Sequence, residues 1–126
     1  MIVGMVVRFP ELRDDGTFTV RARFRAQRPD AAVRLEQHVR LAVQRRTEDR
    51  PEIFLRDFMS LPRVERATPE TLDVVFDGRS GSRLWKDWVI ALTQEVEMLE
   101  GVHFLTFQDG VSGRQHPGWP SADVER

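Results

Sequence analysis

The sequence of 126 residues contains no cysteine, no tyrosine and no asparagine, and Lys86 is its only lysine beside 18 arginines. The lack of cysteine excludes disulfides, thiolate metal sites and cysteine nucleophiles, and it fits a reducing compartment. The excess of arginine over lysine is typical of a GC-rich bacterial genome, so it is weak evidence for nucleic-acid binding. With 40% hydrophobic and 31% charged residues, the composition is that of a soluble globular domain.

Long apolar runs are also missing, and no segment reaches the length needed to span a bilayer. Residues 1–10 are apolar, but they lack the basic start and the small-residue cleavage site of a signal peptide. We therefore expect a cytoplasmic protein with no membrane partner. Charge is uneven along the chain, because residues 1–63 carry 13 basic and 9 acidic side chains while residues 64–126 carry 6 and 11. The simplest interpretation is that the two halves attract each other within one fold.

Residues 17–27 alternate without interruption between two kinds of side chain, which indicates a half-buried β-strand. The apolar side consists of Phe18, Val20, Ala22, Phe24 and Ala26. The polar side consists of Thr17, Thr19, Arg21, Arg23 and Arg25. One face of this strand is therefore predicted to lie on a core, while the other presents three guanidinium groups, named here the arginine ladder (Arg21, Arg23 and Arg25).

The remaining pattern predicts two hairpins, two long helices, a short helix and a last strand. The strands 1–9 and 17–27 are expected to form the first hairpin, 63–67 and 71–77 the second, and 102–108 the last strand. The expected helices are 31–46, 52–59 and 83–99. Apolar residues recur at helical spacing along the first and the last of these helices, and Arg40 faces outward from the first. Pro29 and Asp30 suit the start of the first helix, and Gly101 suits the end of the last one.

The order hairpin, helix, hairpin, helix, strand predicts an α+β fold, with a mainly antiparallel sheet and helices packed on one of its faces. From residue 17 onward, this order is compatible with the ferredoxin-like β-α-β-β-α-β pattern. We expect a single α+β domain over residues 1–109 and an irregular tail over residues 110–126.

The arginine ladder has two interpretations. If the strand 71–77 is its neighbour, Asp73 and Asp77 can pair with the arginines on the open face of the sheet. Alternatively, the ladder binds a phosphate or carboxylate, which guanidinium groups recognise through two parallel hydrogen bonds. Nucleic acid is not expected, since the ladder lacks the interleaved aromatic rings on which bases stack.

A second candidate anion site is the glycine-rich segment 77–83 before the last helix, where Arg79, Arg83 and Lys86 add positive charge. Backbone N–H groups at the start of a helix bind anions readily. The segment nevertheless lacks both nucleotide-binding glycine patterns, and a plain turn capped by Ser82 explains it equally well.

No motif indicates a metal, a cofactor or a catalytic group. The three histidines are far apart and lack the spacing of metal ligands, and no serine lies in a nucleophile-elbow motif. Two tryptophans are the remaining candidates for contacts with a partner. Trp85 lies on the last helix, and Trp119 lies in a tail otherwise rich in proline and glycine.

These observations predict a small non-catalytic interaction or regulatory protein of the bacterial cytoplasm, which forms a homodimer or binds another protein. The alternative is a domain that binds or processes a small phosphorylated or carboxylated molecule through its arginine-rich sheet face. Neither hypothesis involves a cofactor.

Overall fold

The computed structural model describes residues 10–49, 60–79 and 85–116. Along the chain these residues form β1 (Thr17–Ala26), α1 (Pro29–Asp49), β2 (Arg63–Thr68), β3 (Thr71–Arg79), α3 (Trp85–Glu97), β4 (Val102–Asp109) and β5 (Gln115–His116). No helix within these ranges is long and apolar enough to cross a membrane.

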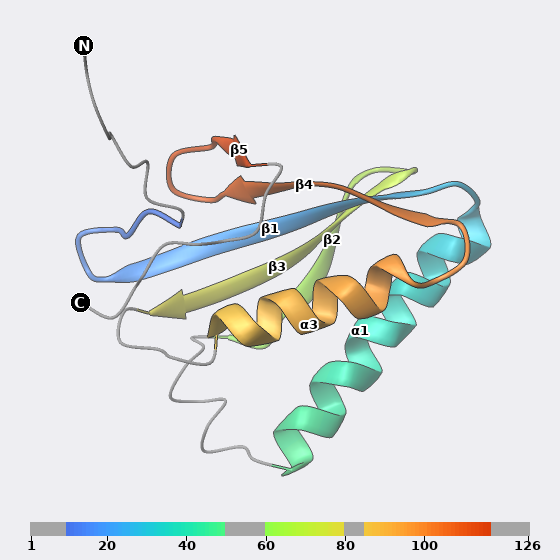
Figure 1. Cartoon of the computed structure of the whole chain (residues 1–126), viewed down its shortest axis with the longest axis horizontal. Helices are drawn as coiled ribbons and strands as arrows, with labels where there is room; N and C mark the ends of the chain where they lie inside the picture. Colours follow the sequence, from blue (N-terminus) through green and yellow to red (C-terminus); the bar gives the residue numbers. More distant parts are fainter. Residues whose placement is uncertain (1–9, 50–59, 80–84, 117–126) are drawn as a thin grey trace.

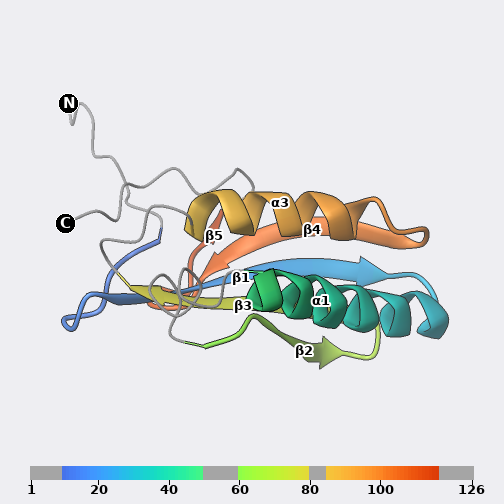
Figure 2. The same ribbon diagram turned by 90° about the horizontal axis from the view of Figure 1, so that it is seen from below.

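The strands form one antiparallel sheet in the order β2-β3-β1-β4-β5. Both helices cover the same face of this sheet (Figures 1 and 2). Each helix connects two parallel strands that have a third strand between them, β3 in one case and β1 in the other. This connectivity is that of the ferredoxin-like split β-α-β pattern, and the predicted α+β fold is confirmed.

The central strand β1 decides which side chains face the helices. Its apolar residues from Phe18 to Phe24 are completely buried. The register with β3 places apolar residues opposite each other: Val20 opposite Phe76, Ala22 opposite Val74 and Phe24 opposite Leu72. Phe18 lies opposite Gly78, where an added β-carbon would come within 2.4 Å of the phenyl ring. The phenyl ring of Phe18 therefore occupies the space that a side chain at position 78 would need, and this position requires glycine.

The helices contribute one apolar stripe each to the core. The buried stripe of α1 consists of Ala31, Ala32, Leu35, Val39 and Val43, and that of α3 consists of Trp88, Val89, Leu92 and Val96. Trp88 also contacts Phe76 of β3 edge to face, with ring centroids 6.1 Å apart. Both stripes follow the spacing that the sequence predicted, because residues three and four apart share one side of a helix.

The ends of the helices differ slightly from the prediction. The first helix continues to Asp49, where the Thr47 hydroxyl donates to the carbonyl of Val43 at 2.9 Å. The last helix ends at Glu97, and Gly101 follows with a φ of 79°. Glycine adopts this left-handed conformation without steric cost.

Two predicted elements, the strand 1–9 and the short helix 52–59, lie outside the described residues. The structure does correct the predicted hairpin between residues 1–9 and β1. Between Val20 and Arg25, β1 pairs with β3 on one side and with β4 on the other. No free edge of this stretch remains for a hairpin partner.

The turn between β4 and β5 depends on the completely buried carboxylate of Asp109. It accepts hydrogen bonds from the backbone N–H of Val111 and from that of Glu11, both at 2.8 Å. Asp109 thereby connects the segment before β1 to the far end of β4. The residues of β5 lie within the segment that the sequence predicted as irregular, and they pair with Phe107 and Gln108.

Candidate functional site on the open sheet face

The face of the sheet that the helices leave open carries the arginine ladder. Because β1 alternates strictly, burial of its apolar side directs Arg21, Arg23 and Arg25 to this open face. The register places Arg23 opposite Asp73 of β3, and Arg21 opposite Val75. Glu65 of β2 in turn lies opposite Asp73. Carboxylates from two neighbouring strands therefore reach the ladder.

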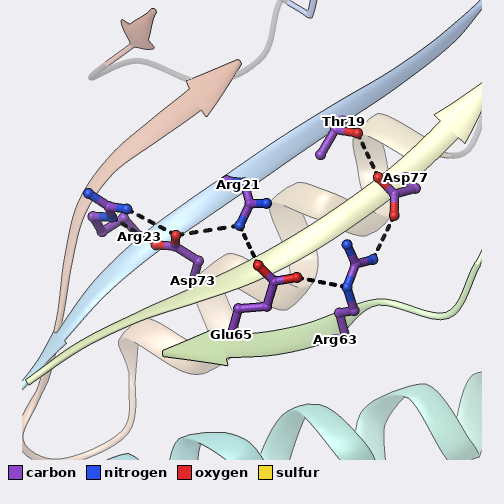
Figure 3. A network of polar contacts seen from close by, with 7 residues as sticks. All are labelled: Thr19, Arg21, Arg23, Arg63, Glu65, Asp73 and Asp77. Atoms are coloured by element: carbon purple, nitrogen blue, oxygen red, sulfur yellow. Dashed lines mark hydrogen bonds and ion pairs between the residues drawn. The ribbon is translucent and has the colours of Figure 1, made fainter. Parts of the chain in front are cut away.

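Arg23 and Asp73 form the most complete ion pair of this face. Nε of Arg23 donates to Oδ1 of Asp73 at 2.8 Å, and Nη2 donates to Oδ2 at 3.0 Å. Such a two-pronged geometry makes use of the planar guanidinium. Arg21 lies beside this pair, since its Nη1 is 2.8 Å from Oε1 of Glu65 and 3.7 Å from Oδ2 of Asp73 (Figure 3).

The contacts continue from Glu65 to the other end of β3 through Arg63. Nε of Arg63 donates to Oε2 of Glu65 at 3.0 Å, and its Nη1 donates to Oδ2 of Asp77 at 2.6 Å. Asp77 also accepts a hydrogen bond from the Thr19 hydroxyl at 2.6 Å. The resulting charge network consists of Thr19, Arg21, Arg23, Arg63, Glu65, Asp73 and Asp77 (Figure 3). Its three guanidinium groups balance its three carboxylates.

Part of this network is withdrawn from solvent. Asp73 is 3% exposed and Thr19 is 6% exposed, and Val75 beneath the network is completely buried. A carboxylate at such a position would strongly destabilise the fold if it had no partner. The arginine side chains supply that partner, while each keeps about a third of its own surface in water.

The pKa values of the network follow these contacts. The hydrogen bond to Asp73 raises the pKa of Arg23, although burial opposes the change. Hydrogen bonding to Arg21 lowers the pKa of Glu65. Burial tends to raise the pKa of Asp77, but hydrogen bonds from Thr19 and Arg63 outweigh it and leave the pKa below its ordinary value. The network therefore favours the charged form of Glu65 and of Asp77.

The structure describes only some of the remaining predicted site residues. Arg25 is exposed on β1 and Arg79 is exposed at the end of β3, and neither has an ion-pair partner within the described ranges. Lys86 lies in the first turn of α3. Arg83 and Trp119 lie outside the described residues, and of Trp85 only the backbone is described. Ligand binding by these groups stays a prediction.

Two members of the network, Arg63 and Glu65, were not singled out by the sequence. The sequence pattern that could have identified them is the alternation of charged and uncharged residues at the start of 63–67. This pattern covers too few positions to assign a face to either side chain. His38 and His103 have polar neighbours as well: Nε2 of His38 lies 3.3 Å from Oε2 of Glu95, and Nε2 of His103 lies 2.8 Å from Nε2 of Gln27. Within residues 10–49, 60–79 and 85–116, no group of three or more metal-ligating side chains could hold an ion.

Comparison with known proteins identifies no relative of this chain. No family model, curated protein or solved structure matches the chain. The geometry of the residues is therefore the basis for any functional proposal.

A double-mutant cycle measures the central ion pair. We expect Asp73→Asn to lower the free energy of unfolding by about 1–3 kcal/mol, because an NH2 group replaces one of the two oxygens that accept from Arg23 and the remaining carbonyl oxygen carries no charge. Combined with Arg23→Gln, it should reveal a coupling energy of roughly 1–3 kcal/mol. Urea denaturation of the four proteins gives these values.

The exposed pair Arg28 and Asp30, 3.4 Å apart, provides the matched control, with an expected coupling of at most about 0.5 kcal/mol. If the coupling between Arg23 and Asp73 were no larger than this control, the account of the network would be wrong.

Acid should destabilise the protein through Asp77 and Glu65. Both carboxyl groups have a lower pKa in the folded state than the ordinary values of 3.8 and 4.5. The unfolded chain therefore binds more protons below about pH 4.5, and the free energy of unfolding falls as the pH drops through the folded pKa values.

The double variant Asp77→Asn, Glu65→Gln should be less stable at pH 7 and should lose less stability between pH 5 and acid than the original protein. Urea denaturation at a series of pH values tests this. An unchanged pH slope in the variant would show that these two groups do not carry the effect.

Proposed function

We propose that the chain is a non-catalytic interaction or regulatory protein that pairs with a second copy of itself through the open sheet face. The observation that carries this proposal is the separation of charge between two neighbouring strands. On the open face, the ladder residues of β1 are all cationic, whereas Asp73 and Asp77 of β3 are anionic. Two adjacent stripes of opposite charge are complementary to the same pair of stripes on another copy.

The symmetry of such a pairing follows from the sheet. A two-fold axis that runs along the strands between β1 and β3 places β1 of each copy over β3 of the other. The register then places Arg23 of each copy over Asp73 of the other, of which 3% is exposed, and Arg25 over Thr71, two residues from Asp73. Each arginine has five N–H donors, and Arg23 uses two of them within its own chain. Donors therefore remain for a carboxylate of the second copy.

The size of the open face limits the area that such a dimer can bury. Four strands about 4.8 Å apart, each about eight residues long at about 3.3 Å per residue, give a face of roughly 500 Å². Two such faces would bury on the order of 1,000 Å² in total, which is near the lower limit for a specific interface. We therefore propose a weak, reversible dimer that salt dissociates.

The lack of cysteine and the arginine bias support placement in a bacterial cytoplasm.

The alternative, an anion site on the sheet face, has less support. Arg21 and Arg23 already bind carboxylates of their own chain, so a small anion would have to displace them, whereas a second copy would add contacts to the donors that these pairs leave free. A free anion would have to compete with Asp73 and Glu65, which are held close to these arginines by the sheet. Arg25 alone offers little beyond a single exposed charge.

The dimer can be tested by light scattering coupled to size exclusion at low and high salt. We expect a concentration-dependent dimer at low salt that dissociates at high salt, because screening weakens contacts between exposed charges. Arg25→Glu should weaken the dimer at low salt, because it replaces one cation of each facing stripe by an anion, and it should leave stability unchanged, because Arg25 is exposed and belongs to no ion pair of the described chain.

Arg45→Glu is the matched control, because Arg45 is exposed on α1, on the opposite layer, and also has no ion-pair partner among the described residues. It should leave the dimer intact. A monomer at every concentration and salt would contradict the proposal, and so would equal effects of the two substitutions.

A further inference from the structure

A groove of about 660 Å³ lies between the second half of α1 and the edge strand β2. Its apolar surface comes from Val39 and Val43 of α1, from Val64 of β2, and from Leu61 and Pro62 just before β2. Val39, Val43 and Pro62 are buried, whereas Leu61 is 52% exposed. The volume falls within the range of small-molecule sites, which are mostly apolar with a few polar groups.

The rim of the groove is charged and has an excess of positive charge. Arg40, Arg63 and Arg66 line it together with the single carboxylate Glu36. Nε of Arg66 lies 2.9 Å from Oε1 of Glu36, so this pair is neutral. Arg63 is bound to Asp77 and Glu65 of the charge network.

Arg40 remains as the one cation of the rim without an ion-pair partner among the described residues. It lies one turn after Glu36 on α1, and the buried Val39 and Val43 lie next to it along the helix. A guanidinium at the mouth of an apolar groove can bind a carboxylate through two parallel hydrogen bonds, while the groove takes up an apolar body.

We propose that this groove binds an amphipathic monocarboxylate, with its carboxylate on Arg40 and its apolar body against Val39, Val43 and Val64. A single negative charge matches the single uncompensated cation. Because the ligand has an apolar body, it should bind at Arg40 beside the apolar groove and not at the exposed Arg25 of the sheet face. The groove lies beside α1 at the edge of the sheet and shares Arg63 with the charge network, whereas the proposed dimer rests on β1 and β3.

Isothermal titration with octanoate tests the site, with octanol and inorganic phosphate as comparison ligands. We expect octanoate to bind, and octanol and phosphate to bind at least about tenfold more weakly, since each lacks one of the two recognised parts. Arg40→Gln should weaken octanoate binding by about tenfold or more and should leave octanol unaffected.

Arg45→Gln serves as the matched control, because Arg45 is exposed on the same helix but does not line the groove. It should bind octanoate like the original protein. Leu61→Asp provides a second variant, in which a half-exposed apolar wall becomes anionic; it should also abolish octanoate binding. Equal affinities for octanoate and octanol would overturn carboxylate recognition, and failure of octanoate to bind would overturn the site.

Discussion

The pairing of the arginines of β1 with the carboxylates of β3 is the constraint on which the open side of the sheet depends. The antiparallel register that buries Phe24 against Leu72 also sets Arg23 opposite Asp73. A slip of one residue would exchange the two faces, exposing the phenylalanines and burying the arginines. Apolar burial and charge pairing therefore specify the same register, and each reinforces the other.

Periodicity in the sequence predicted the parts of the fold in which one side of an element is buried. The alternation of β1 and the stripes of α1 and α3 were recognisable because a buried face imposes its period over many residues. The order of the strands in the sheet was inferred only from the analogy with the ferredoxin-like pattern. The role of Glu65 could not be predicted, because it depends on which strand lies beside β3. The short strand β5 is held by Asp109 and by two residue pairs, which leave no periodic signal.

The sequence predicted which side chains could bind a ligand, but not which of them already have partners within the folded chain. The sequence identified the arginine ladder and stated both of its interpretations, and the structure shows Arg21 and Arg23 in ion pairs with Glu65 and Asp73. Arg40 was read only as an outward-facing residue of a helix. Its position at an apolar groove depends on how α1 packs beside β2, which no local pattern encodes. The surface thus contains a charge-balanced sheet face and a separate groove with one cation in excess.

The most direct test of the network is the exchange of arginine Nε–H protons with water, measured by NMR at low salt in the Arg25→Glu variant and in the original protein. In the structure, Nε of Arg23 and Nε of Arg63 each donate to a carboxylate. We therefore expect both protons to exchange much more slowly than those of exposed arginines such as Arg40, in both proteins. Equally fast exchange at Arg23, Arg63 and Arg40 would contradict the claim that the sheet face neutralises its own charges.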